Sequence, residues 1–207
     1  MCRQLKGGGM EITMKISRMF SYDSFKGTKN YLNTQKKYEI VRTIIYFGIS
    51  LSLFAAGWIT TGTKVNLLTI VAVLGCLPAS KSTVEMIMFL RYKSLSEDAA
   101  QAIEKHSEGL SVLYDMVFTS YEKNYNIGHF AVKGNTIVGY TQDNKFDEKS
   151  FYSHIDQILK KDNIKGTTVK IFSDMKKYTD RLEQLKELDT EETLNESIIN
   201  TLKSVSL

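Results

Sequence analysis

Two apolar stretches separated by five residues constrain the fold of this 207-residue chain more than any other feature. The first, TIIYFGISLSLFAAGWI at 43–59, contains no Asp, Glu, Lys, Arg or His, and the second is VNLLTIVAVLGCLPA at 65–79. As helices they would span roughly 26 Å and roughly 22 Å, which approaches the thickness of the bilayer hydrocarbon. We predict a two-helix transmembrane hairpin. The alternative is a hairpin buried in the core of a soluble protein.

The positive charges near this hairpin are distributed unevenly. The turn between the two stretches contains one cation, Lys64. The flanking sequences contain more: Arg18, Lys26, Lys29, Lys36, Lys37 and Arg42 before the hairpin, and Lys81, Arg91 and Lys93 after it. Segments rich in Lys and Arg remain on the cytoplasmic side of a membrane. We therefore predict a multi-pass protein of the cell membrane with both termini in the cytoplasm.

The overall charge of +4 combines a basic N-terminal part with an acidic C-terminal part. Residues 1–42 contain nine Lys or Arg against three Asp or Glu, and residues 95–207 contain fourteen against nineteen. Aromatic and aliphatic residues alternate with the cations of segment 15–42, which is typical of a segment that lies on a membrane surface. The expected partner is a bilayer with an anionic inner leaflet. Nucleic acid is the disfavoured alternative, because the next residues insert into the membrane and the distal part is acidic.

Residues 95–207 have the patterning of a folded domain. Ser96 and two acids predict a helix start, and alternating or β-branched residues predict three antiparallel strands with a turn at Gly134-Asn135. Asp147 is placed to cap a helix over 148–161, which precedes a short strand at 167–172. The expected fold class is α+β, with a two-helix transmembrane hairpin followed by a cytoplasmic domain of order αβββαβα plus a terminal helix.

These patterns divide the chain into six segments. They are a leader artefact or disordered tail (1–14), a basic membrane-surface segment (15–42), two transmembrane helices (43–60 and 65–80), a juxtamembrane helix (81–94) and a cytoplasmic α+β domain (95–207). Residues 1–14 are set apart because MCRQLKGGGM resembles a translated ribosome-binding site, after which the chain restarts at Met10 or Met14.

No residue pattern predicts a catalytic, cofactor-binding or metal-binding site. His106, His129 and His154 have no ligand spacing, and Cys2 and Cys76 form neither a disulfide nor a metal motif. Three acids, Asp143, Asp147 and Glu148, could bind a cation, but a turn and a helix start also favour acids at these positions. We therefore assign no site residue and no cofactor.

Small residues on the two apolar stretches permit close helix packing. Gly48, Gly57 and Gly75 could support a homo-oligomer that forms through the hairpin, including a pore. Neither stretch has an ionisable residue near its centre, which disfavours channel or transporter activity by a single chain.

Two resemblances to known families are present. The segment FSYDSFKGTKNYLNTQKKYEIVRTIIYFGISLSLFAAGWITTGTKVNLLTIVAVLGCLPASKS at 20–82 resembles uncharacterised two-span membrane proteins of Gram-positive bacteria, some of which are labelled as similar to O-linked GlcNAc transferases. The element order over 96–187 resembles that of restriction-endonuclease-like domains. That family holds a metal with an acid on one strand and an acid-x-Lys on the next, and the strands GHFAVKG and NTIVGYTQD contain no such pair.

The sequence favours a membrane-anchored protein whose cytoplasmic domain is a binding or interaction module for a protein or ligand. A membrane-tethered, degenerate nuclease-fold domain is the alternative. A glycosyltransferase-like activity is disfavoured, because the domain is short and contains no loop for a sugar phosphate. We expect no enzymatic activity.

Overall fold

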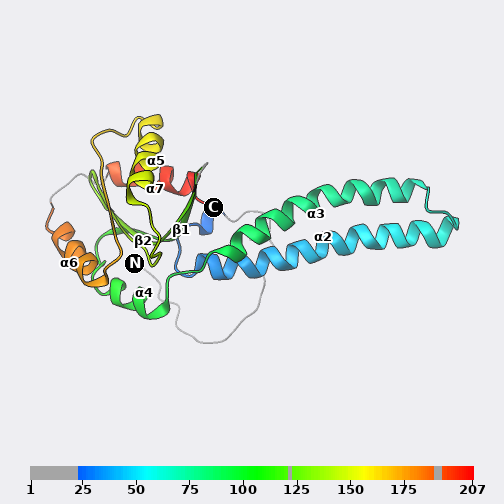
Figure 1. Cartoon of the computed structure of the whole chain (residues 1–207), viewed down its shortest axis with the longest axis horizontal. Coiled ribbons are helices and arrows are strands. Elements are labelled where there is room, and N and C mark those ends of the chain that lie inside the picture. Colours follow the sequence, from blue (N-terminus) through cyan, green and yellow to red (C-terminus); the bar gives the residue numbers. More distant parts are fainter. Residues whose placement is uncertain (1–22, 121–122, 189–192) are drawn as a thin grey trace, which may run out of the picture.

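The computed structural model describes residues 23–120, 123–188 and 193–207. The predicted leader and the first part of the basic segment lie outside these residues. Two long apolar helices are followed by a small domain with a mixed sheet and flanking helices, so the chain is α+β (Figure 1).

The two long helices form an antiparallel hairpin. After a short 3-10 turn, η1 (Asp23–Phe25), comes α2 (Tyr31–Thr61), and α3 (Leu67–Arg91) returns beside it (Figure 1). Gly62 ends α2 in the left-handed conformation with φ 65°, which glycine adopts without steric cost. The side chain of Asn66 caps α3 by accepting the N–H of Thr69 at 2.9 Å. A single continuous helix, α3, therefore includes most of the second predicted span and the predicted juxtamembrane segment.

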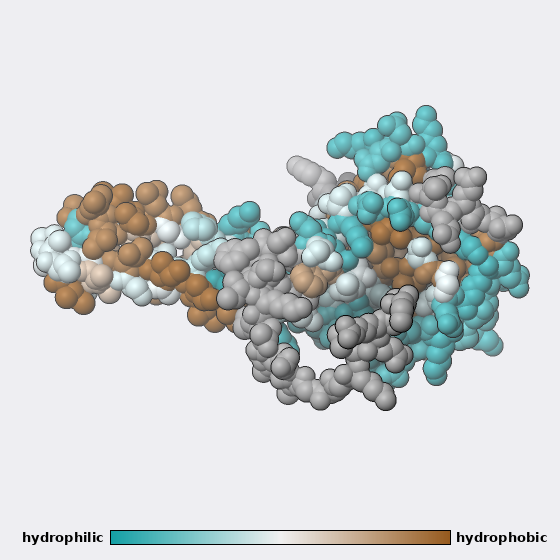
Figure 2. Space-filling model, turned by 180° about the vertical axis from the view of Figure 1, so that it is seen from behind, coloured by the Kyte–Doolittle hydropathy of each residue, from teal (hydrophilic) through white to brown (hydrophobic). Residues whose placement is uncertain are grey.

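The hairpin projects away from the sheet domain and exposes apolar side chains along its length (Figures 1 and 2). Both helices are long and apolar enough to cross a membrane. The exposed residues include Ile44, Ile49, Leu51, Ile59, Leu67, Ile70, Val73, Leu74 and Leu77. Beyond its base, the hairpin is therefore not buried in the core of the sheet domain, which was the alternative that the sequence left open.

Small residues bring the two helices close together. A Cβ atom added at Gly57 would lie 2.9 Å from the Cβ of Leu68, and one at Gly75 would lie 2.7 Å from the Oγ of Ser50. Both glycines thus serve the packing of α2 against α3 within one chain. Gly48, in contrast, has no neighbour within 4 Å of such a Cβ among the described residues.

The sheet contains four strands in the order β1-β2-β3-β4. They are β1 (Ser111–Thr119), β2 (Asn124–Lys133), β3 (Thr136–Tyr140) and β4 (Thr168–Phe172). The first three pair antiparallel, and β4 pairs parallel to β3. A parallel pair needs a crossover connection, which α5 (Glu148–Lys161) provides. Asp147 accepts the N–H of Ser150, which confirms the predicted cap.

Helices cover both faces of the sheet (Figure 1). On one face, α5 and α7 (Thr193–Val205) pack on Phe130, Val132 and Ile137. On the other, α4 (Glu97–Glu104) and α6 (Met175–Lys186) pack on Ala131 and Val138. Successive strand residues point to opposite faces, so strands buried on both sides become continuously apolar.

Two segments, one before α2 and one after α7, pair with the outer edge of β1. Gly27 forms a bridge to Tyr114, and Ser206 forms a bridge to Phe118. A third apolar cluster joins the start of α2 and the end of α3 to this strand through Tyr31, Leu32, Phe89 and Val117. The base of the hairpin is therefore part of the domain core.

Leu32→Ala should lower the free energy of unfolding by about 2–5 kcal/mol, because it leaves a cavity in this third cluster. The matched control is Leu51→Ala on the hairpin, where the side chain is 66% exposed and detergent can cover the site. Chemical denaturation of both variants in detergent micelles measures the difference. Equal stability of the two variants would show that the base of α2 does not pack on the sheet.

Candidate functional site at the base of the hairpin

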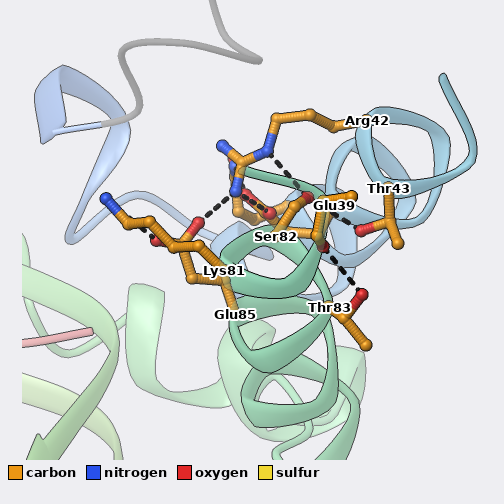
Figure 3. Close-up of polar contacts among 9 residues, drawn as sticks. Glu39, Arg42, Thr43, Lys81, Ser82, Thr83 and Glu85 are labelled. Atoms are coloured by element: carbon orange, nitrogen blue, oxygen red, sulfur yellow. Dashed lines mark hydrogen bonds and ion pairs between the residues drawn. The ribbon is translucent and has the colours of Figure 1, made fainter. Parts of the chain in front are cut away.

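A network of charged and polar side chains joins α2 to α3 close to the sheet domain. We call it the Arg42 cluster and define it as Gln35, Glu39, Arg42, Ser82 and Glu85 (Figure 3). The guanidinium of Arg42 forms ion pairs with Glu39 and Glu85, and its Nε donates to the Oγ of Ser82 at 3.2 Å. Gln35 donates to Glu39 at 2.9 Å. Two carboxylates from different helices thus share one guanidinium.

The Arg42 cluster is shielded from solvent. Glu39 is fully buried, Arg42 is buried, and the side chain of Glu85 is 24% exposed. Lys81 approaches Glu85 to 3.9 Å from the exposed side, so two cations balance two carboxylates. Burying a charge is costly unless it is paired and hydrogen-bonded, which explains why each charge here has a partner. Arg42, one of the flanking cations in the sequence, is therefore neutralised within the hairpin.

Asp115 connects the hairpin to the sheet. This acid lies in the middle of β1 and is buried. Its carboxylate accepts the N–H of Leu95 at 2.9 Å and the N–H of Leu32 at 3.4 Å. The first N–H groups of a helix have no partner within that helix, and Asn30 provides no side-chain cap for α2. A carboxylate from the sheet performs this capping instead.

The backbone of Asp115 is left-handed, with φ 52°. This region is uncommon for residues other than glycine, although Asp and Asn occupy it more readily than most. Burial raises the pKa of Asp115, while hydrogen bonds from Ser94 and from the N–H groups of Leu95 and Leu32 favour its charged form. The strained backbone directs the carboxylate to the segments that enter and leave the hairpin.

A cavity of about 420 Å³ lies between the end of α3 and the sheet. Its polar lining includes Arg91, Lys93, Asn124, Asn126, Gln142 and Asp143. Asn126 donates to the carbonyl of Lys93 at 3.2 Å, and its Oδ1 is buried with no hydrogen-bond partner among the described residues. The residues come from the segment after α3, from β2 and from the turn after β3. This combination of cations and amides can bind an anion that also carries hydrogen-bond donors.

The three histidines lie apart from one another. His106 contacts Glu183 at 2.8 Å on the surface, and His154 lies on α5 beside Tyr125. His129 is fully buried, and its Nδ1 lies 2.6 Å from the hydroxyl of Tyr178. Burial lowers the pKa of His129 to about 3, so this imidazole is neutral in the folded chain at physiological pH.

The acids near the end of the sheet have structural partners. Asp147 pairs with Lys123 at 2.8 Å, and this contact lowers the pKa of Asp147. Asp143 accepts the N–H of Lys145 at 2.9 Å, and both residues lie in the turn after β3, outside the strands. Within the described residues there is no group of three or more His, Cys, Asp or Glu side chains that could hold a metal ion.

No protein family, curated protein or solved structure matches this chain. The resemblances to two-span membrane proteins and to restriction-endonuclease-like domains therefore stay predictions. The interpretation of the site depends on its own geometry.

Replacing Arg42 should destabilise the chain strongly. Arg42→Gln leaves Glu39 and Glu85 as close, partly desolvated carboxylates, and we expect a loss of about 3 kcal/mol or more. Lys81→Gln is the matched control, because the Lys81 side chain is 81% exposed and its removal should change stability very little. Thermal unfolding in detergent compares the two. An unchanged midpoint for Arg42→Gln would contradict the buried ion pairs.

Stability should depend on pH through His129. Its pKa is depressed in the folded state, so below about 6.5 the unfolded chain binds a proton that the folded chain does not. The free energy of unfolding should therefore fall by up to about 1.4 kcal/mol for each pH unit between about 6.5 and 4. His129→Gln should remove this component. Denaturation of both proteins across that range measures it, and parallel pH profiles would contradict the buried neutral imidazole.

Proposed function

We propose that the protein is anchored in the cell membrane by the α2–α3 hairpin and holds its sheet domain at the cytoplasmic surface as a binding module. The observation that carries this proposal is the continuous exposed apolar surface of a hairpin that projects away from the domain (Figure 2). Such a surface is costly in water and stable in hydrocarbon.

The lengths of the helices agree with insertion from one side. The 31 residues of α2 extend about 46 Å, and the 25 residues of α3 extend about 38 Å. A bilayer with its headgroups is about 40–45 Å thick. About 20 residues separate Arg42 from the tip of the hairpin, so the Arg42 cluster falls near the end of the hydrocarbon, where charged groups become tolerable.

The orientation rests on charge. Lys64 is the only cation at the tip, whereas Lys81, Arg91 and Lys93 lie at the other end of the hairpin with the sheet domain. The rule that positive segments remain inside places this end and both termini in the cytoplasm.

A binding role fits the domain better than catalysis. The strands β2 and β3 contain no Asp or Glu, which a nuclease-like centre would need there. The base of the hairpin is instead fixed to the sheet by Asp115 and the third apolar cluster. A domain held firmly at a membrane meets membrane-bound ligands at high local concentration.

Cysteine labelling tests the anchor and its orientation. In a background with Cys2→Ser and Cys76→Ser, Thr63→Cys at the hairpin tip should react with a membrane-impermeant maleimide added to intact bacterial spheroplasts. Ser153→Cys, on an exposed position of α5, should react only after lysis. The protein should also stay in the membrane pellet after carbonate extraction. Release into the supernatant would contradict the anchor, and labelling of Ser153→Cys in intact spheroplasts would contradict the orientation.

A further inference from the structure

The cavity at the base of the hairpin contains cations that the rest of the described structure does not neutralise. Arg91 and Lys93 form no ion pair among the described residues. Lys36 of α2 lies close enough to Lys93 for the two ammonium groups to repel each other. Asp143 is the one acid among the described residues that line the cavity. Arg91 and Lys93 together with Asp143 leave one net positive charge in the cavity, which suits a ligand with a single negative charge.

The acid of the cavity complements these cations. Of the two oxygens of the Asp143 carboxylate, only Oδ1 accepts a hydrogen bond among the described residues, from the N–H of Lys145, so the second oxygen is an acceptor without a partner there. An acceptor in such a position is matched by a hydroxyl donor of a ligand. The cavity therefore suits a phosphodiester anion whose other substituent carries hydroxyl groups.

The position of the cavity indicates where that phosphodiester comes from. Ile87 and Leu90 on α3 are each 50% exposed, so the apolar surface of the hairpin continues to the residue before Arg91. If this surface contacts lipid, the cations at Arg91 and Lys93 lie at the depth of the headgroups, where phosphates are concentrated.

We propose that this cavity binds the headgroup of an anionic phospholipid that carries hydroxyl groups, of which phosphatidylglycerol is the simplest example. The proposal rests on the membrane anchor proposed above. Arg91 and Lys93 contact the phosphate, and the Asp143 carboxylate accepts a hydrogen bond from a glycerol hydroxyl. A volume of about 420 Å³ accommodates such a headgroup and leaves the acyl chains outside, on the apolar surface of the hairpin nearer its tip.

The test uses the full chain reconstituted in nanodiscs of equal phosphatidylglycerol and phosphatidylcholine, followed by native mass spectrometry of the lipids that it retains. Phosphatidylcholine has no hydroxyl donor and no net charge. Both lipids carry a phosphodiester, but the ammonium of choline opposes binding beside cations. Each cation is expected to contribute about fivefold in affinity for the lipid with a net negative charge, so two should favour phosphatidylglycerol by about 25-fold. Arg91→Gln/Lys93→Gln should reduce this preference to near parity.

The matched control is Lys170→Gln/Arg181→Gln, which removes the same charge from a surface at β4 and α6. This control should keep the preference for phosphatidylglycerol. An equal loss in both double variants would overturn the proposal, because it would show a general effect of surface charge. Equal retention of the two lipids by the unaltered chain would also overturn it.

Three outcomes distinguish a failure of this inference from a failure of the proposed membrane anchor. Soluble glycerol phosphate at the concentration of the lipid should not displace it, and complete displacement would overturn the membrane source of the ligand. A chain that does not enter nanodiscs would overturn the membrane anchor and this inference together. A chain that enters them without lipid preference would overturn only the present proposal.

Discussion

The buried carboxylate of Asp115 connects the parts of this molecule. It lies on β1, yet its hydrogen bonds go to the first turn of α2 and to the segment that follows α3. A helix start needs acceptors for its free N–H groups, and a carboxylate there also interacts favourably with the helix dipole. One side chain thus caps the start of α2, binds the segment that follows α3, and fixes both to the sheet. Its left-handed backbone is the conformational cost of that arrangement.

The two helices of the hairpin have different surroundings at their two ends. Toward the tip, its surface is apolar and its contacts depend on small residues such as Gly75 against Ser50. Toward the base, the Arg42 cluster replaces apolar packing with paired charges. Paired charges specify which helix faces meet, because a rotation of α2 against α3 would separate Glu85 on α3 from the guanidinium of Arg42 on α2. The cluster therefore fixes the register of the hairpin before the chain enters the sheet domain.

Local patterns in the sequence predicted the secondary structure well. The cap at Asp147 and the turn at Gly134 followed from spacing and from backbone preferences, and both occur in the structure. The contacts that join the two helices to each other and to the sheet were not predictable in this way. Lys81 and Glu85 are four residues apart on one helix, a spacing that can be recognised locally, but the pairing of Glu85 with Arg42 joins residues 43 positions apart. Asp115 gave one signal, an acid within an apolar strand, but its partners Leu32 and Leu95 are determined by tertiary packing.

The short segment that follows α3 both contacts Asp115 and lines the cavity. Leu95 donates its N–H to Asp115, and Lys93 and Leu95 both line the cavity. Leu95 also lies over Gly128, where an added Cβ would come within 2.7 Å of its side chain. A ligand that binds only when this segment is in place stabilises the segment by the free energy of binding. Because the same segment connects α3 to the sheet, a ligand bound in the cavity, as proposed above, would also stabilise the attachment of the hairpin. A larger residue at Gly128 would shift the Leu95 side chain, which lines the cavity, whereas the contact with Asp115 is made by the Leu95 backbone.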